Sequence, residues 1–291
     1  MALDVGRIEK PVRKLRRLLK NAPKHPTPDK VHDLRTNSRR FQTAVEAFAL
    51  DSHGNERRLL KGLRRLRKRA GKIRDMDVLI GHALTVNPNG EQDCVVQLLE
   101  HLGAIRARQA RKLHDEMVKA TPLRTRLKRS QARIEKLATK NNGSSSGKAP
   151  AKAPPDVISK SLQLSAELKA PARLDKKNLH PYRLKVKALR YVLQLSDRAD
   201  QPFIEKLGEV QDAIGEWHDW LELSEIAEEV IDHGPKCKLV ARLKEIAERK
   251  FQGALDTTNE MRSAYLTHPG PKREAGKLRT PVLEAASALT A

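Results

Sequence analysis

The feature that most constrains the fold of this chain is an apolar repeat with spacings of three and four residues. Between positions 57 and 73 the apolar side chains recur at these spacings and form one stripe on a helix. They are Leu59, Leu63, Leu66, Ala70 and Ile73. No stretch of comparable length alternates with a period of two, as a half-buried strand would. Long tracts of Leu, Ala, Glu, Lys and Arg also favour helices, so the sequence predicts an all-α fold.

The same periodicity predicts a series of helices and two breaks. The helices are expected at residues 4–20, 28–51, 56–86, 92–120, 122–139, 156–170, 178–198, 201–233 and 236–266. A stretch rich in Gly, Ser, Ala and Pro interrupts the pattern and is typical of a flexible linker. The chain is therefore expected to comprise a first helical bundle at 1–140, a linker at 141–155, a second bundle at 156–267 and a loose tail at 268–291.

Two short motifs recur in the two halves of the chain. VHDLRTNSRR at 31–40 and LHPYRLKVKALR at 179–190 each place basic residues three and seven positions beyond a histidine. A later pair, GKIRD at 71–75 and GEWHD at 215–219, aligns Gly with Gly and Asp with Asp. The first pair aligns at an offset of 148 residues and the second at 144, a difference that an ordinary loop accommodates. A helical repeat of this kind predicts two bundles related by a pseudo-twofold axis.

Each histidine motif places its basic residues on one side of a helix. Thr27 is a suitable N-cap, and Pro28 a suitable first residue, for the helix that carries the first motif. Successive helical residues turn by about 100°, so His32, Arg35 and Arg39 lie within about 60° of one another, opposite the apolar face. With Asn178 as the expected N-cap, the second basic face holds His180, Arg183, Lys187 and Arg190. Arg67 and Arg74, on the helix that follows the first motif, are expected to reach the first basic face.

The charge of the chain indicates an anionic partner. Lys and Arg outnumber Asp and Glu by 58 to 36, which gives a net charge of +22. Residues 1–140 hold 34 basic and 15 acidic side chains, a balance of +19, and the remaining residues hold 24 and 21, a balance of +3. Such an excess attracts polyanions, and the first half is expected to contact the partner over the wider area.

The order of these motifs resembles the conserved histidine α-helical domain, or CHAD, family over roughly residues 4–265. The resemblance implies two four-helix bundles packed about a pseudo-twofold axis, with a basic groove between them that binds inorganic polyphosphate. It also implies association with polyphosphate granules, as in some members. The matching positions are His32, Arg35, Arg39, Arg40, Arg74 with Asp75, His180, Arg183, Lys187 and Arg190. Arg67 is a further candidate polyphosphate-binding residue from its place on the helix. Three positions depart from the usual pattern: Gln42, Ala188 and His218.

Two other functions compete with polyphosphate binding. The pairs His32-Asp33 and His218-Asp219 are typical of metal-dependent phosphohydrolases of the HD type, but no compelling further His and Asp accompany them. No GxxxxGK[ST] loop, HExxH or ExExK motif occurs, so a non-catalytic binder is expected. Nonspecific nucleic-acid binding at low salt is the second alternative. Only nine Phe, Tyr and Trp residues are available for the stacking that single-strand binding requires, and Tyr191 alone interleaves a basic face.

The cysteines and the N-terminal sequence bear on compartment and cofactors. Cys94 and Cys237 are too few and too far apart in the sequence to predict a disulfide framework or a cysteine zinc site, so they are expected to be inert apolar residues. No metal or cofactor is expected. The first twenty residues lack the apolar core of a signal peptide, and no run of about 18 apolar residues predicts a membrane span. A cytoplasmic protein is expected.

Overall fold

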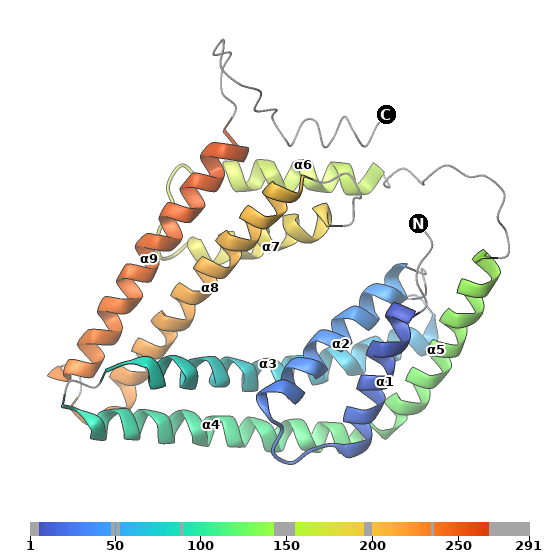
Figure 1. Cartoon of the computed structure of the whole chain (residues 1–291), viewed down its shortest axis with the longest axis horizontal. Coiled ribbons are helices and arrows are strands. Elements are labelled where there is room, and N and C mark those ends of the chain that lie inside the picture. Colours follow the sequence, from blue (N-terminus) through green and yellow to red (C-terminus); the bar gives the residue numbers. More distant parts are fainter. Residues whose placement is uncertain are drawn as a thin grey trace, which may run out of the picture. The chain divides into compact units, whose positions relative to one another are not determined.

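The computed structural model describes residues 6–47, 50, 53–87, 90–142, 155–194, 200–233 and 236–267. Within these residues the chain forms nine α-helices and no β-strand, which confirms the all-α prediction (Figure 1). The helices are α1 (Gly6–Asn21), α2 (Pro28–Ala47), α3 (Gly54–Thr85), α4 (Gln92–Lys119), α5 (Thr121–Asn142), α6 (Pro155–Lys169), α7 (Leu179–Leu193), α8 (Gln201–Val230) and α9 (Lys238–Tyr265).

Three predicted helix ends are wrong: α7 ends at Leu193 rather than 198, and the other two share one physical reason. Helix α2 ends at Ala47 rather than 51, and α8 ends at Val230 rather than 233. Leu50 and Ile231 lie beyond these ends in non-helical backbone, yet both side chains are buried. An apolar residue that packs from the turn after a helix extends the apolar period past the last helical residue.

The predicted linker and tail fall mostly outside the described residues. Helix α5 continues to Asn142, and α6 begins at Pro155, a residue suited to the first position of a helix. The rest of the linker, 143–154, and the tail at 268–291 lie outside the part of the chain that the structure describes.

The chain divides into two compact units. The first comprises Met1–Asn87 and Val95–Ala149, and the second comprises Pro88–Cys94 and Pro150–Ala291. Helices α1, α2, α3 and α5 and most of α4 therefore belong to the first unit, and α6 to α9 belong to the second. The segment Pro88–Cys94, which the sequence groups with the first bundle, belongs to the second unit.

The first unit has its core between α1, α2, α3 and α5, to which α4 adds Ala110, Leu113 and Met117. Helix α1 packs on α2 and α5, and α3 packs on α2 and α5. The apolar stripe of α3 is buried, as predicted, together with Leu34, Phe41 and Val45 of α2. The hydroxyl oxygen of Thr27 accepts a hydrogen bond of 3.4 Å from the backbone N–H of Lys30, so Thr27 caps α2 as expected.

The second unit has its core around Trp217. This side chain is 1% exposed and its ring centroid lies 5.3 Å from that of Phe251 on α9. Tyr182, Val186 and Leu189 of α7 face the same core, as their spacing predicts. The Asp200 carboxylate accepts a hydrogen bond of 3.2 Å from the backbone N–H of Phe203 and fixes the start of α8.

Candidate anion-binding surfaces

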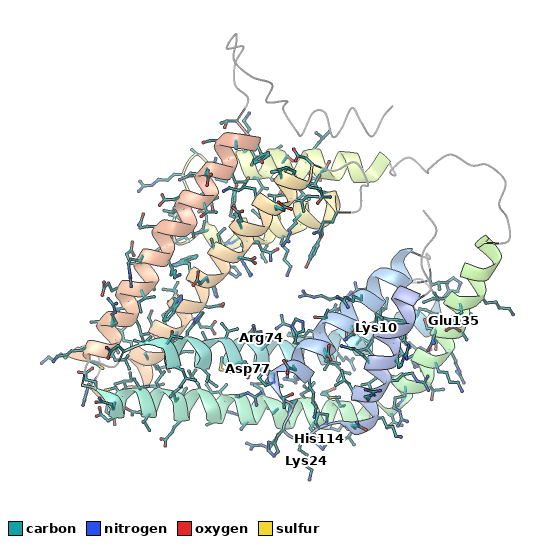
Figure 2. The ribbon with its side chains drawn as sticks, viewed as in Figure 1. Lys10, Lys24, Arg74, Asp77, His114 and Glu135 are labelled. Atoms are coloured by element: carbon teal, nitrogen blue, oxygen red, sulfur yellow. The ribbon has the colours of Figure 1, made fainter. Side chains whose placement is uncertain are left out.

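The basic residues of α2 and α3 in the first unit form a surface that we call the first basic stripe, and the two helices bring together residues about 40 positions apart. Its members are His32, Arg35, Arg39, Arg40, Arg67 and Arg74. On α2, His32, Arg39 and Arg40 are exposed and Arg35 is half-buried. Burial lowers the pKa of the Arg35 guanidinium, and the nearby charges of Arg39 and Arg74 lower it further, whereas Asp75 raises it. Arg74 projects from α3 (Figure 2) and is exposed. The two helices therefore contribute to one cationic cluster, in which Asp75 offsets part of the repulsion around Arg35.

Arg67 also reaches α2, but its guanidinium is already engaged. Its Nη2 donates a hydrogen bond of 2.8 Å to Oε1 of Gln42. At the offsets of the repeat, the counterpart of Gln42 is Arg190 and the counterpart of Arg67 is Gln211. The residue types at the aligned positions are therefore interchanged: the amide is on α2 and the cation on α3, whereas the cation is on α7 and the amide on α8.

His32 and Asp33 point toward different partners. The Nε2 atom of His32 lies 3.3 Å from the hydroxyl of Thr36, whereas the Asp33 carboxylate accepts hydrogen bonds of 2.9 and 3.2 Å from Nζ of Lys14 on α1. Asn37 donates a further hydrogen bond to this carboxylate. Asp33 thus ties α1 to α2. Across the described ranges, neither His–Asp pair belongs to a group of three or more side chains that could hold a metal ion.

The second basic stripe begins at the start of α7, where a turn replaces the expected side-chain cap. Asn178 is the N-cap residue, but its side chain makes no cap hydrogen bond to the helix. Instead, its Oδ1 accepts a hydrogen bond of 2.9 Å from the backbone N–H of Asp175. The Asp175 carboxylate in turn accepts hydrogen bonds from the backbone N–H groups of Lys177 and Asn178. These bonds fix the turn that sets the position of His180.

His180 lies against a second histidine that the sequence analysis did not assign to the site. The ring centroids of His180 and His218 are 4.4 Å apart, with the ring planes at 40°. Burial lowers the pKa of His180, and the neighbouring His218 and Arg183 lower it further. The Nδ1 atom of His180 is buried and has no hydrogen-bond partner within the described part of the chain. The repeat held the missed signal, because His218 is the counterpart of Arg74 at the offset of 144.

Two arginines of the second basic stripe rest on two glycines of α8. Arg183 Nε donates a hydrogen bond of 2.8 Å to the backbone carbonyl of Gln211, and a Cβ added at Gly215 would lie only 2.7 Å from Arg183 Nη2. A Cβ at Gly208 would likewise lie 3.0 Å from Cζ of Arg190. Both arginines are half-buried, so they do not simply face solvent. The glycines allow both guanidinium groups to lie directly against the helix, and the hydrogen bond to Gln211 fixes the orientation of Arg183.

Lys187 completes the second basic stripe between these two arginines. It is half-buried, and its Nζ lies 5.9 Å from the ring centroid of the exposed Tyr191, one turn further along α7. At this distance the ammonium group interacts with the face of the ring. The aromatic residue that interleaves the basic face therefore helps to position a cation.

A further basic surface, the α1–α5 cleft, was missed by the sequence analysis. It has a volume of about 860 Å³ and is lined by cations with no carboxylate among them. The sequence does contain the pattern that predicts it, because basic residues recur three and four positions apart on both helices and so share one face of each. The cations are Arg13, Arg16, Arg17, Lys20, Arg124 and Lys128.

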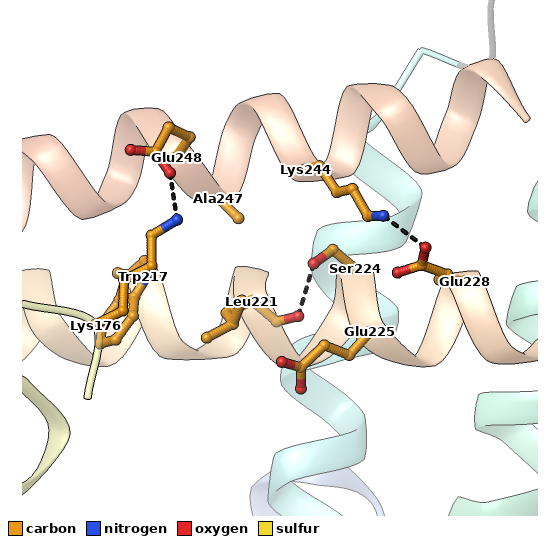
Figure 3. Close-up of a pocket in the computed structure, with 9 residues that line it drawn as sticks. All are labelled: Lys176, Trp217, Leu221, Ser224, Glu225, Glu228, Lys244, Ala247 and Glu248. Carbon is orange, nitrogen blue, oxygen red and sulfur yellow. Dashed lines mark hydrogen bonds and ion pairs between the residues drawn. The ribbon is translucent and has the colours of Figure 1, made fainter. Parts of the chain in front are cut away.

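The cavity between α8 and α9 in the second unit has the opposite chemistry (Figure 3). Glu225, Glu228 and Glu248 line it together with Lys176 and Lys244. Each lysine is paired: Lys176 Nζ lies 2.6 Å from the Glu248 carboxylate, and Lys244 Nζ lies 2.7 Å from that of Glu228. Carboxylates outnumber lysines, so this cavity does not suit an anion.

A protein-family model for the CHAD domain matches residues 9–228, which include every residue of both basic stripes. No curated protein and no solved structure matches the chain. None of the helices described here is long and apolar enough to cross a membrane.

Proposed function

Because the chain belongs to the CHAD domain family, we propose that it binds inorganic polyphosphate through its two basic stripes and catalyses no reaction on it. One observation carries the proposal: the same cationic arrangement is built twice in one chain. In each unit a histidine-led helix supplies cations three and seven residues on, and the next helix of the repeat adds a basic residue at the aligned position, Arg74 or His218.

The chemistry of both stripes suits a chain of phosphates. Polyphosphate repeats the same anion without bases, so its binder needs many cations along a track rather than a shaped pocket. A guanidinium offers two parallel hydrogen bonds to phosphate oxygens, and an ammonium adds a point charge. Cations on one face of a helix recur about every 5.4 Å, the rise of one turn, which supplies such a track.

The fixed arginines of the second basic stripe add a second argument. Arg183 and Arg190 are held against Gly215 and Gly208, so less side-chain entropy is lost when they bind an anion than for a freely rotating arginine. A nearby phosphate would also favour the protonated form of His180. The stripe is therefore prepared for an anion before the ligand arrives.

A position-specific charge reversal tests the proposal. The variant Arg39→Glu/Arg74→Glu changes two exposed residues of the first basic stripe. The control Arg57→Glu/Arg64→Glu makes the same change in net charge at two exposed residues of α3 that belong to neither repeated motif. A third variant, Arg16→Glu/Arg124→Glu, reverses two charges in the α1–α5 cleft.

Affinity for polyphosphate of defined length is measured by calorimetry at about 0.15 M salt, where distant charges are screened beyond about 8 Å. We expect the stripe variant to lose at least about tenfold more affinity than the control, because only the stripe is in contact with phosphate. Equal losses in all three variants would indicate diffuse attraction. A loss confined to the third would move the site to the α1–α5 cleft.

The absence of catalysis and the place of action are tested separately. Phosphate release from polyphosphate is followed with and without added Mg²⁺, Mn²⁺ or Zn²⁺, and no turnover is expected because the Asp33 carboxylate is bound to Lys14. In cells we propose that the protein is cytoplasmic and gathers at polyphosphate granules. A fluorescent fusion of the wild type should mark the granules, and the Arg39→Glu/Arg74→Glu variant should not.

A further inference from the structure

Four side chains with metal-ligating atoms, none of them part of either basic stripe, converge in the second unit. One ligand atom from each of Glu91, Cys94, His233 and Cys237 lies within 4.8 Å of all the others. The Sγ atoms of Cys94 and Cys237 are 3.5 Å apart, although 143 residues separate them in the sequence. Cys94 Sγ lies 3.2 Å from Nδ1 of His233, and Cys237 Sγ lies 2.9 Å from a carboxylate oxygen of Glu91. We call this group the cysteine cluster.

The ends of three helices build the cysteine cluster. Glu91 precedes α4 and Cys94 lies in its first turn, His233 follows the end of α8, and Cys237 is the N-cap residue of α9. The backbone N–H of Leu239, in the first turn of α9, donates a hydrogen bond of 2.8 Å to the Glu91 carboxylate. Two helix N-termini, α4 and α9, therefore place positive partial charge beside ligands that would be anionic with a metal bound.

Three of the six separations are somewhat shorter than those around a tetrahedral zinc ion, and all six are within 4.8 Å. Bonds of about 2.3 Å to sulfur and about 2.1 Å to nitrogen or oxygen place two sulfurs about 3.8 Å apart, and a sulfur about 3.6 Å from either lighter atom. The corresponding distances here are 3.5, 3.2 and 2.9 Å. Small side-chain rotations, of a few tenths of an ångström at the ligand atoms, would admit the ion.

We propose that the cysteine cluster is a structural site for a divalent cation of the Zn²⁺ type. Two thiolates, one imidazole and one carboxylate form a complete set of four protein ligands, and soft sulfur ligands exclude Mg²⁺ and Ca²⁺. Both sulfurs are nearly inaccessible, at 2% and 1% residue exposure, so they suit a closed site better than a reactive nucleophile.

A further carboxylate is placed to orient the histidine ligand. Nε2 of His233 lies 3.9 Å from a carboxylate oxygen of Asp93, beyond hydrogen-bond length but within reach after a small movement, while Nδ1 lies 3.2 Å from Sγ of Cys94. A carboxylate beside the second ring nitrogen is a common outer partner of metal-bound histidines. The bound cation would tie the segment at Glu91–Cys94 to the turn between α8 and α9.

The inference does not rest on polyphosphate binding, and it concerns residues that the family match only partly covers. The match ends at residue 228, before His233 and Cys237. The number and spacing of the cysteines predicted no zinc site, but each cysteine has a second ligand type nearby in the sequence, in Glu91-x-x-Cys94 and His233-x-x-x-Cys237. Two and three intervening residues are typical spacings for ligand pairs of zinc sites.

Metal binding is tested on the full chain, without polyphosphate. The metal content of the protein purified under reducing conditions is measured by inductively coupled plasma mass spectrometry. After treatment with a chelator and reductant, the protein is titrated with Zn²⁺ against a chromophoric competitor, and with Co²⁺ as a spectroscopic probe. We expect one equivalent of Zn²⁺, and for Co²⁺ the thiolate charge-transfer and tetrahedral d–d bands.

The variants Cys94→Ser, Cys237→Ser and His233→Gln are each expected to weaken Zn²⁺ binding by at least about tenfold. His233 is exposed, so His233→Gln remains informative if a cysteine variant fails to fold. The control His53→Gln, at another exposed histidine, should bind as the wild type does. The proposal is overturned if the reduced wild type takes up no stoichiometric Zn²⁺, if His233→Gln binds it unchanged, or if the purified protein contains a Cys94–Cys237 disulfide that reduction does not convert into a metal site.

Discussion

At the scale of single residues, Gly215 shows how the second basic stripe depends on the absence of a side chain. Arg183 lies across Gly215 and donates to the carbonyl of Gln211. The contact that a Cβ would disturb is with the far end of a flexible side chain, so the helix itself can accept alanine. Binding and stability are therefore expected to respond differently to the same substitution.

We predict that Gly215→Ala weakens polyphosphate binding by about threefold to tenfold while the free energy of unfolding stays within about 1 kcal/mol of the wild type. Alanine gains up to about 1 kcal/mol of helix propensity, and loss of the hydrogen bond from Arg183 costs a similar amount. The matched control is Gly253→Ala on α9, where a Cβ meets no atom within 4 Å. It should raise stability and leave binding unchanged. Calorimetric titration and urea unfolding measure the two quantities, and unaltered binding by Gly215→Ala would remove Arg183 from the site.

The imidazole of His180 makes the stability of the folded chain depend on pH, in a direction that its pKa determines. Its pKa is lowered in the folded chain by burial, by His218 and by Arg183, whereas the pKa of a histidine in an unfolded chain is about 6.5. The neutral form is therefore favoured by the fold. As the pH falls below about 6.5, the unfolded chain gains a proton before the folded chain does, so this contribution to stability is lost as the pH falls through the folded pKa.

Polyphosphate should reverse the preference of His180, because a bound anion stabilises the imidazolium. We predict that affinity rises as the pH falls from about 7.5 to about 6, with proton uptake on binding, while the unliganded protein becomes less stable over the same change. Calorimetry in two buffers of different ionisation enthalpy measures the uptake. His180→Gln should reduce it. Uptake of the same size in that variant would assign the proton to another group.

At the scale of helices, the apolar period predicted where the helices lie and which of their faces are buried. The positions of α1 to α9 and the buried stripe of α3 follow from spacings of three and four, because a helix must bury one face. The same arithmetic gives the direction of Arg183 and Arg190 around α7. It cannot show that they rest on glycines of α8, because that depends on which helix packs beside α7. The cysteine cluster was unpredictable for the same reason, since its halves are about 140 residues apart.

The hydrogen bond between Gln42 of α2 and Arg67 of α3 predicts that substitutions at these two positions are coupled in their effect on stability. The variant Gln42→Arg removes the hydrogen bond of 2.8 Å and places a second guanidinium group opposite Arg67. We expect it to lower the free energy of unfolding by about 1 kcal/mol. Arg67→Gln removes a charge-assisted bond and should also be destabilising. The double variant restores a cation opposite an amide, as the residue types at Arg190 and Gln211 are arranged in the repeat. A double-mutant cycle by urea unfolding should give a coupling of at least about 0.5 kcal/mol, and additive losses would contradict the pairing.

At the scale of the whole molecule, charge is distributed unequally between the two halves of the sequence, which share one design. The first 140 residues carry +19 and the rest carry +3, yet each unit has a basic stripe. A diffuse surface would attract ligand almost entirely through the first half, whereas contact sites would make both stripes matter. The expectation that the two stripes line one groove stays a prediction.

Competition between polyphosphate and DNA distinguishes contact sites from diffuse charge in the whole molecule. Affinity for any polyanion falls as salt rises, because every neutralised phosphate releases counterions. At about 0.15 M salt the Debye length is near 8 Å, so hydrogen bonds at contact are screened much less than distant charges. Arginines held against α8 should therefore retain part of their affinity for a slender phosphate chain. DNA is bulkier and less densely charged, and the second basic stripe offers only Tyr191 for stacking.

We predict that polyphosphate outcompetes single-stranded and duplex DNA of equal phosphate content by at least about tenfold, a gap of about 1.4 kcal/mol. The measurement is displacement of a labelled polyphosphate at several salt concentrations. If DNA displaces it equally well, or if both ligands dissociate along the same salt curve, the stripes act only as diffuse positive charge.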